Sequence, residues 1–301
     1  MNAISPAQIS DELFATCRRL AAGASCDGSV ASVARFVARL GMRLARPPRI
    51  ALLGEFNTGK STLANVLMGS GVLPTSVHAN TRFPVRLHYA NVPTLEVELS
   101  DRSRHPMSLA EVDALQRGEA RLLHVGLPVA RLKKFELIDT PGLASGQSGL
   151  DEMSLEACTR CHIAIWCTMS TQAWKATEKV VWRSLPQRLQ SEGILVVTYK
   201  DAVRAGRDRE RLAARLDAEA RPHFRSLAMV AAADAERALG SGGTGAAQTE
   251  EWRESGGAEL EALVLEAVAR HLAARVGAAE RLLDRAARRL DARADRGLMA
   301  A

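Results

Sequence analysis

A sequence pattern suited to phosphate binding lies near residue 50. Residues Gly54 to Ser61 read G-E-F-N-T-G-K-S and fit the P-loop pattern G-x-x-x-x-G-K-[ST]. In such a loop, glycines let the main chain approach phosphate oxygens, amides and a helix N-terminus point at them, and Lys60 neutralises the β- and γ-phosphates. The Ser61 hydroxyl suits Mg²⁺. We predict that a nucleotide is held by Asn57, Thr58, Gly59, Lys60, Ser61 and Thr62.

A second pattern is an apolar run that ends in a carboxylate. Residues 135–138 lead into Asp139-Thr140-Pro141-Gly142. In P-loop nucleotidases, an aspartate after such a strand reaches Mg²⁺ through water, and the glycine amide meets the γ-phosphate. The two patterns together predict a Mg²⁺-dependent nucleotide site with Asp139 at the metal and Gly142 at the phosphate.

A third pattern concerns the base of the nucleotide. An apolar run from 193 to 197 precedes Thr198-Tyr199-Lys200-Asp201. Guanine-specific proteins carry [NT]-K-x-D at such a strand end, where the aspartate accepts hydrogen bonds from N1–H and the 2-amino group, a donor pair that adenine lacks. Here Tyr199 takes the usual lysine position: its ring could lie against the base, Lys200 could replace the lysine through a local shift, or the segment could be an ordinary strand exit. We predict a guanine site that includes Thr198, Lys200 and Asp201.

Strands that alternate with helices must position these residues. Apolar runs predict strands at 50–53, 135–138, 163–168, 193–198 and 227–230. Helical spacing predicts helices at 62–67, 174–189 and 209–223. This alternation indicates an α/β fold with a mostly parallel, doubly wound sheet. Further patterns predict a hairpin of two strands at 83–89 and 95–99, a capped helix at 108–117 and a strand at 122–125.

Both ends of the chain are predicted to be helical. The apolar spacing indicates two helices within residues 5–46 and one long amphipathic helix from 257 to 296. Pro47-Pro48 ends the first pair, and a glycine-rich run at 240–245 reads as a loop. The predicted parts are N-terminal helices over 1–48, a nucleotide domain over 49–239, a flexible loop and helix start over 240–256, and a C-terminal helix over 257–301.

Composition narrows the classes of protein and partner. The chain has 301 residues, of which 47% are hydrophobic and 25% charged, and no apolar stretch is long enough to span a membrane. Five cysteines without a signal peptide predict a cytoplasmic protein rather than a disulfide framework. With 4% aromatic residues, base-stacking surfaces and hence nucleic acid are not expected. The net charge of +6 and the arginines between 281 and 296 leave open peripheral contact with an anionic inner membrane or an ordinary solvated helix face.

The chain resembles the GTPase domain of bacterial dynamin-like proteins. The resemblance rests on Gly54–Leu63, on Leu73–Val77 followed by Thr81, and on Leu137–Leu143, and it covers residues 49–239. It implies a P-loop GTPase domain flanked by a helical bundle from both chain ends, with GTP or GDP as ligand. It also implies hydrolysis of GTP to GDP and phosphate.

The same resemblance implies roles for individual residues. Mg²⁺ would be bound by Ser61, Thr81 and Asp139, and catalysis would involve Lys60, Thr81 and Asn57. Residues Ala231 to Ala233 would lie near the guanine oxygen. Asn57 matches a P-loop asparagine that related GTPases use to hold K⁺ when two nucleotide domains face each other, and its alternative role is to stabilise the loop through its own amide.

Departures from the family pattern leave other functions open. Leu143 stands where Ras-like proteins carry a glutamine that orients water, so slow hydrolysis accelerated by K⁺ and by nucleotide-dependent homodimerisation is the leading hypothesis. The alternative is a poorly hydrolysing regulatory partner of a larger dynamin-like protein, which the short sequence after the GTPase domain also favours. A P-loop ATPase is a third interpretation, which only the base site separates from the first.

Overall fold

The computed structural model describes residues 29–69, 83–116, 119–143, 148–241 and 249–298. The chain forms two compact units, one of residues 48–268 and one of residues 1–47 together with 269–301. The first unit contains all the predicted nucleotide-binding residues, and the second contains helical segments from both ends of the chain. The four-part division given above remains a prediction.

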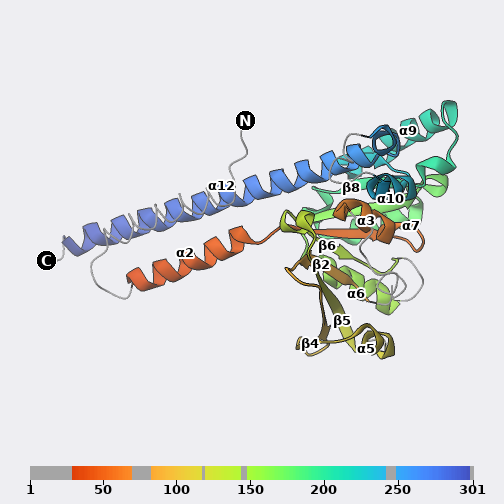
Figure 1. Ribbon diagram of the computed structural model, residues 1–301. Helices are drawn as coiled ribbons and strands as arrows, with labels where there is room; N and C mark the ends of the chain where they lie inside the picture. The colour runs from red at the N-terminus through yellow and green to blue at the C-terminus, as the bar shows by residue number, and fades with distance from the viewer. Residues whose placement is uncertain (1–28, 70–82, 117–118, 144–147, 242–248, 299–301) are drawn as a thin grey trace. The chain divides into compact units, whose positions relative to one another are not determined.

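The first unit is built on one sheet (Figure 1). In this sheet the described residues form nine strands in the order β4-β3-β5-β2-β6-β1-β7-β8-β9. From β6 to β9 all neighbouring strands in this order are parallel, as the alternation of strands and helices predicts. The strands are β1 (Arg49–Gly54), β2 (Val85–Tyr89), β3 (Thr94–Leu99), β4 (Arg104–Pro106), β5 (Ala120–Leu127), β6 (Glu136–Asp139), β7 (Ile163–Met169), β8 (Ile194–Thr198) and β9 (Ser226–Met229).

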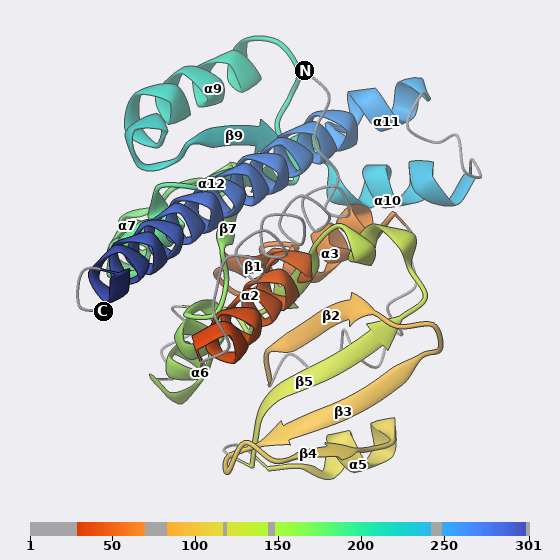
Figure 2. The ribbon, with the colours of Figure 1, turned by 90° about the vertical axis from the view of Figure 1, so that its left-hand side faces the viewer.

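The predicted hairpin between 83–89 and 95–99 is wrong. Both segments are strands, but β5 lies between them, parallel to β2 and antiparallel to β3 (Figure 2). Almost all residues of β5 are buried, which suits its position between β2 and β3 in the interior of the sheet. Alternation of apolar and polar residues predicts a strand but does not identify its neighbour.

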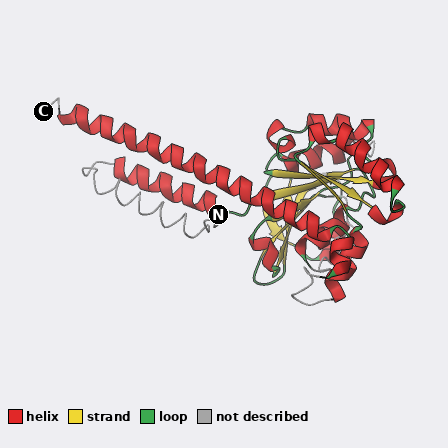
Figure 3. Ribbon diagram, turned by 90° about the horizontal axis from the view of Figure 1, so that it is seen from above, coloured by secondary structure: helices red, strands yellow, loops and turns green. Residues whose placement is uncertain are grey.

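Helices cover both faces of the parallel part of the sheet (Figure 3). The described helices that follow β1 in the chain are α3 (Lys60–Met68), α5 (Leu109–Ala114), α6 (Ser148–Cys158), α7 (Ala176–Ser184), α8 (Gln187–Gln190), α9 (Arg207–Glu219), α10 (Ala232–Ser241), α11 (Glu250–Glu254) and α12 (Gly257–Leu298). Short 3₁₀ turns are η1 (Ala130–Lys133), η2 (Ser170–Gln172), η3 (Lys200–Ala202) and η4 (Arg221–His223). The α/β fold with a mostly parallel sheet is therefore confirmed.

The helix predicted over 174–189 is divided in two. Leu185 has an extended conformation, with φ −67° and ψ 152°, and it separates α7 from α8. Pro186 follows directly, and a residue before proline is driven out of the helical region by a clash with the proline ring. The break therefore has a local cause that was readable in the sequence.

Aromatic side chains form much of the core on one face of the sheet. Trp182 packs edge-on against Trp166 of β7, with ring centroids 5.9 Å apart, and lies 4.2 Å from the ring of Phe224. Glu178, one turn before Trp182 on α7, is buried and accepts hydrogen bonds from the Trp166 indole nitrogen at 3.0 Å and from the Thr168 hydroxyl at 2.9 Å. These contacts satisfy buried polar groups and fix α7 against β7.

The second unit contains α2 (Ser29–Ala45) and the part of α12 beyond residue 268. Arg275 of α12 donates a hydrogen bond to the carbonyl of Arg46 at 2.9 Å and another to the carbonyl of Arg43. The guanidinium thus satisfies main-chain oxygens at the C-terminal end of α2, which an arginine there also favours through the helix dipole. The first helix predicted within 5–46 lies outside the described residues. Among the described helices, none has the length and apolar content needed to cross a membrane.

Candidate functional site

The P-loop connects β1 to α3 through two glycines whose conformations other residues rarely adopt. Gly54 ends β1 with φ +144°, and a Cβ there would lie 2.2 Å from the carbonyl oxygen of Cys167 on β7. Gly59 precedes α3 with φ +77°. Gly54 therefore has no room for a side chain, and Gly59 has a left-handed conformation that favours glycine, so the loop turns tightly at the carboxyl end of β1 and presents the N-terminus of α3.

Lys60 lies inside this loop. Its side chain is 7% exposed, and Nζ donates hydrogen bonds to the carbonyls of Gly54 at 3.2 Å and Glu55 at 2.6 Å. Burial lowers the pKa of Lys60, while the negative charges of Asp139 and Glu55 oppose that shift. The ammonium group is therefore held at the loop by main-chain oxygens and nearby carboxylates.

The structure brings Ser61 and Asp139 together. Leu52 of β1 is in register with Asp139 of β6, and the Ser61 hydroxyl donates a hydrogen bond to Asp139 Oδ2 at 2.8 Å. A hydroxyl and a carboxylate are hard oxygen donors of the kind that Mg²⁺ prefers, so this pair fits the predicted metal site. Thr81, the third predicted ligand, lies outside the described residues.

The turn after Asp139 lies directly against the P-loop. A Cβ on Gly142 would lie 2.7 Å from the main-chain nitrogen and Cα of Phe56, so this position also excludes a side chain. The amide of Leu143 donates to the Gly54 carbonyl at 3.0 Å, and the Leu143 side chain is fully buried. The position that carries glutamine in Ras-like proteins is therefore part of the core here.

The end of β8 reaches the other side of the P-loop. Thr198 is buried, and its hydroxyl lies 2.9 Å from the carbonyl of Thr58 and 3.1 Å from that of Thr168. Tyr199 follows in a left-handed conformation, with φ 54°, and its hydroxyl donates to the Asn57 carbonyl at 3.2 Å. The side chain of Tyr199, which is 42% exposed, therefore extends from the end of β8 to the P-loop.

A pocket of about 790 Å³ opens beside Asp201. Its lining includes Lys200, Asp201, Ala231 and Ser255, and Asp201 is exposed. Lys200 Nζ donates to the carbonyl of Glu254 at 2.7 Å, so in this structure Lys200 is engaged with α11. Ala231, which the family resemblance places near a guanine oxygen, is thus in the same pocket as the carboxylate predicted to read the base.

Sequence reasoning missed an ion pair that holds the P-loop from outside. Lys175 Nζ pairs with Glu55 Oε2, and the Thr177 hydroxyl donates to Glu55 Oε1 at 2.7 Å. Both partners lie at the beginning of α7. Glu55 occupies a variable position of the P-loop pattern, so the local pattern assigned it no role, and its partners are too distant in sequence to be recognised from spacing.

The Cys158-x-x-Cys161-His162 segment, which spells a haem-attachment pattern, packs at the beginning of β7. Both thiols are free and buried, and burial raises the pKa of Cys161 to about 12. His162 Nδ1 accepts a hydrogen bond from the amide of Arg49 at 2.9 Å. In the described residues these side chains serve packing and strand pairing, in accord with the low reactivity of buried thiols.

Comparison with known proteins identifies relatives among bacterial dynamins. The chain is 33% identical over 162 residues to "Dynamin-like protein 2" of Campylobacter jejuni, a match that covers 52% of this chain and 26% of that protein. It is 31% identical over 124 residues to the isoniazid-induced protein IniC of Mycobacterium tuberculosis, covering 39% and 25% of the two chains. The matched segments thus represent about a quarter of each relative's length.

Solved structures show the same fold. A structure described as an oligomerised bacterial dynamin pair, for long-range sensing and tethering of membranes, matches with a TM-score of 0.66 at 14% identity, covering 94% of this chain and 55% of that one. LeoA, a bacterial dynamin GTPase from ETEC, matches with a TM-score of 0.50 at 14% identity, covering 94% and 47%. At this level of identity the likeness concerns the fold.

A match between the sequence and a family model shows which family the chain belongs to. The model of the dynamin family matches residues 50–201, which is half of the chain. The matched region begins in β1, includes the P-loop and Asp139, and ends at Asp201, so it contains the three patterns from which the nucleotide site was predicted. The chain belongs to the dynamin family.

Proposed function

We propose that this chain binds guanine nucleotide and hydrolyses GTP to GDP and phosphate with Mg²⁺, and that nucleotide state governs its pairing with a second dynamin-like molecule. The observation that carries the proposal is the approach of Ser61 to Asp139 at 2.8 Å beside the buried ammonium of Lys60. A hydroxyl, a carboxylate and a lysine gathered at the N-terminus of a helix form a site for a metal and a phosphate chain.

Each predicted site residue would have a role that follows from its chemical group. Lys60 and the amides of the P-loop would bind phosphate oxygens, with Gly142 contributing its amide from the adjoining turn. Ser61, Asp139 and Thr81 would hold Mg²⁺, which when bound neutralises negative charge on the phosphates. Thr58 and Thr62 belong to the same loop and helix start, where main-chain amides point at an anion.

Base recognition would fall to the pocket beside Asp201. The exposed carboxylate can accept from two guanine donors, and a site built for those donors rejects adenine. Tyr199 would provide an aromatic wall in place of the aliphatic part of a lysine, because its ring extends from β8 to the P-loop. Thr198 would contribute by holding the end of β8 to the P-loop, and Lys200 by fixing the segment that carries Asp201 to α11.

Calorimetric titration with GDP, GTP, ADP and ATP in Mg²⁺ and potassium buffer tests the binding proposal. Guanine nucleotides should bind and adenine nucleotides should not, and Lys60→Ala should abolish binding because the phosphates lose their main counter-charge. Equal binding of both bases would move the chain to the ATPase interpretation. No binding of any nucleotide would refute the proposed function.

The catalytic part of the proposal rests on Asn57. Its side chain is exposed and makes no hydrogen bond to the described part of the chain, while its carbonyl accepts from Tyr199. This disfavours a role in which the amide merely stabilises the loop, and it leaves an oxygen free to coordinate K⁺ near the phosphates. GTP turnover should therefore rise with K⁺ and with protein concentration. Equal rates in K⁺ and Na⁺ at every protein concentration would contradict this.

A second candidate is a regulatory partner of a larger dynamin-like protein. It is favoured by the buried Leu143, which leaves that position without a polar side chain to orient water. The solved bacterial dynamin pair that this chain resembles is described as tethering membranes, and a peripheral position at a membrane belongs to the same proposal. Low turnover of the isolated chain that is restored by a larger dynamin-like protein would favour this role over that of an independent GTPase.

A further inference from the structure

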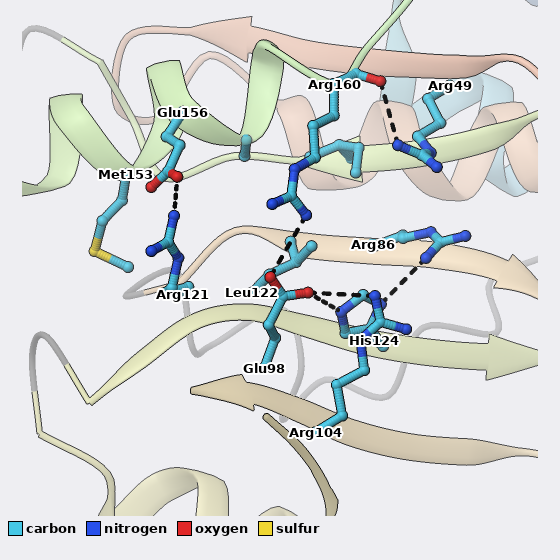
Figure 4. A pocket seen from close by; sticks show the side chains of 12 residues that line it. Arg49, Arg86, Glu98, Arg104, Arg121, Leu122, His124, Met153, Glu156 and Arg160 are labelled. Carbon is cyan, nitrogen blue, oxygen red and sulfur yellow. Dashed lines mark hydrogen bonds and ion pairs between the residues drawn. The ribbon is translucent and has the colours of Figure 1, made fainter. Parts of the chain in front are cut away.

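A second, smaller pocket lies between α6 and strands of the sheet, and its lining includes no residue of the P-loop. Arg49 is the first residue of β1 and Arg160 precedes β7, whereas the P-loop follows the last residue of β1. Because β1 and β7 are parallel, their amino ends lie side by side, and residues of α6 complete the lining of the pocket. The pocket has a volume of about 60 Å³. Figure 4 shows the side chains that line it.

Arginines dominate this pocket. Five of them line it, four from strands of the sheet and the last from the turn before β7: Arg49, Arg86, Arg104, Arg121 and Arg160. Three carboxylates contact these arginines, namely Glu98, Glu136 and Glu156. Five guanidinium groups against three carboxylates leave an excess of two positive charges, in a place where the surrounding protein weakens screening by water.

Two of the three carboxylates, Glu98 and Glu136, already accept several hydrogen bonds. Glu98 is buried, and its Oε2 accepts from His124 Nε2 at 3.1 Å and from Arg104 at 3.3 Å, while Oε1 lies 3.5 Å from Arg160 (Figure 4). Both oxygens of Glu136 likewise accept from Arg86, and one of them also from Arg49. The excess positive charge is therefore not balanced within the cluster.

His124 adds no charge to this cluster at neutral pH. It is 1% exposed, and burial lowers its pKa to about 4 against the opposing hydrogen bond to Glu98. At neutral pH the ring is uncharged, donates from Nε2 to Glu98, and lies with Nδ1 3.4 Å from an Arg86 nitrogen. It orders the buried carboxylate and leaves the arginines to face the pocket.

The arginines retain unused hydrogen-bond donors. Arg104 and Arg160 each make a single ion pair in the described part of the chain, and their side chains are 46% and 42% exposed. Arg121 also makes a single pair, with Glu156. Each guanidinium carries five N–H donors in a planar arrangement that matches tetrahedral oxyanions, so the three groups can still bind a ligand.

We propose that this pocket binds a compact phosphate dianion, either inorganic phosphate or the terminal group of a phosphate monoester. The charge of the ligand matches the excess charge of the arginines. A volume of about 60 Å³ accommodates a tetrahedral anion but not a nucleotide. Donors from three separate segments favour an anion with several oxygens over a monovalent ion such as chloride.

The test is calorimetric titration of the full chain with phosphate against chloride at constant ionic strength. Because the P-loop can also bind phosphate, the titration is repeated with Lys60→Ala. Phosphate binding should persist in Lys60→Ala and weaken at least about tenfold in the double variant Arg104→Gln, Arg160→Gln, since two charge-assisted contacts are lost. Binding that disappears with Lys60→Ala and survives in the double variant would place the ion at the P-loop and overturn the proposal.

Matched variants separate a binding role from a structural one. Arg221→Gln removes an exposed arginine with a single ion pair, to Asp217, outside the pocket, and should leave phosphate affinity unchanged. Arg104→Lys retains the charge but not the planar donors, so it should weaken binding by less than the double variant. If the double variant does not fold, as judged by circular dichroism, Arg160→Gln alone should still weaken binding. Equal affinity in Arg160→Gln and Arg221→Gln would refute the site.

Vesicles distinguish the sources of phosphate. Phosphatidylcholine vesicles with and without phosphatidic acid are sedimented with the chain, and inorganic phosphate is added as competitor. Phosphatidic acid binding that phosphate competes away supports a lipid headgroup, and phosphate binding without vesicle binding supports a soluble ligand. The absence of both would show that the arginines form an ion-pair network only.

Discussion

The hydroxyl of Tyr199 donates a hydrogen bond to the main-chain carbonyl of Asn57 across 3.2 Å. The contact joins the segment predicted to read the base to the loop predicted to bind the phosphates. Gly59 is close enough that a Cβ there would lie 3.9 Å from the tyrosine ring. A tyrosine in place of the usual lysine therefore still ties the two halves of the site together.

Removing this hydroxyl should weaken nucleotide binding without abolishing it. Tyr199→Phe keeps the ring but loses a hydrogen bond worth about 1 kcal/mol, so GDP affinity should fall about fivefold in calorimetry. Tyr199→Ala removes the ring as well and should cost more. Unchanged affinity in both variants would show that Tyr199 plays no part in the site.

Asp201 should determine the choice of base. Asp201→Ala removes the carboxylate that accepts from guanine, and GDP affinity should fall about 100-fold, the loss expected for charged hydrogen bonds. Asp208→Ala, on the first turn of α9, removes a carboxylate outside the pocket and is the control. A similar loss for both variants would indicate a general charge effect rather than base recognition.

Ser61 should matter only when Mg²⁺ is present. Ser61→Ala removes one metal ligand and the hydrogen bond to Asp139, so the gain in affinity for a GTP analogue on adding Mg²⁺ should shrink about tenfold. Affinity without Mg²⁺ should be unchanged. Ser184→Ala, at the end of α7, controls for loss of an unrelated hydroxyl. An undiminished Mg²⁺ effect in Ser61→Ala would remove Ser61 from the metal site.

Stability should depend on pH through His124. Its pKa is lowered to about 4 in the folded chain by burial, with Arg104 and Arg86 adding to the shift and Glu98 opposing it. In the unfolded chain the histidine has its ordinary pKa of about 6.5. Between about pH 4 and 6.5 the unfolded chain therefore binds more protons than the folded chain. Stability is therefore fully present above about pH 6.5 and is lost as pH falls toward 4, by about 1 kcal/mol between pH 7.5 and 5.5.

The measurement is urea unfolding at these two pH values for the native chain and for His124→Gln. Glutamine can still donate to Glu98 but does not titrate, so the variant should lose about 1 kcal/mol less than the native chain on acidification. Other histidines are common to both chains and cancel in the comparison. Equal pH dependence in the two chains would show that His124 is not the group responsible.

Local patterns predicted the parts of the site that lie close together in sequence. Lys60 and Ser61 follow from one loop, and Asp139 follows from the end of an apolar strand, so their convergence needs only the parallel pairing of β1 with β6. The break at Pro186 was also readable, because the residue before proline avoids the helical region. The neighbour of β2 was not, since many strands could satisfy the same alternation.

Contacts between distant residues that no motif specifies could not be predicted. Lys175 and Glu55 are 120 positions apart; Lys175 belongs to no recognised pattern, and Glu55 occupies a variable position of the P-loop pattern. The arginines of the second pocket are spread from Arg49 to Arg160, singly and at irregular intervals. Only the order of strands in the sheet brings them to one pocket, and that order depends on tertiary packing rather than on local propensity.

The connection between the sheet and α12 is tightly packed. Gly256, which precedes α12, has φ +84°, and a Cβ there would lie 2.1 Å from the carbonyl oxygen of Met229 at the end of β9. Next to it, the Ala231 amide donates to the Ser255 carbonyl at 2.8 Å, and Lys200 donates to Glu254. Hydrogen bonds thus connect the loop that carries Asp201 and the end of β9 directly to the residues that precede α12. If a bound base displaced that loop, the first turn of α12 would have to move with it, because these contacts hold the connecting residues in place.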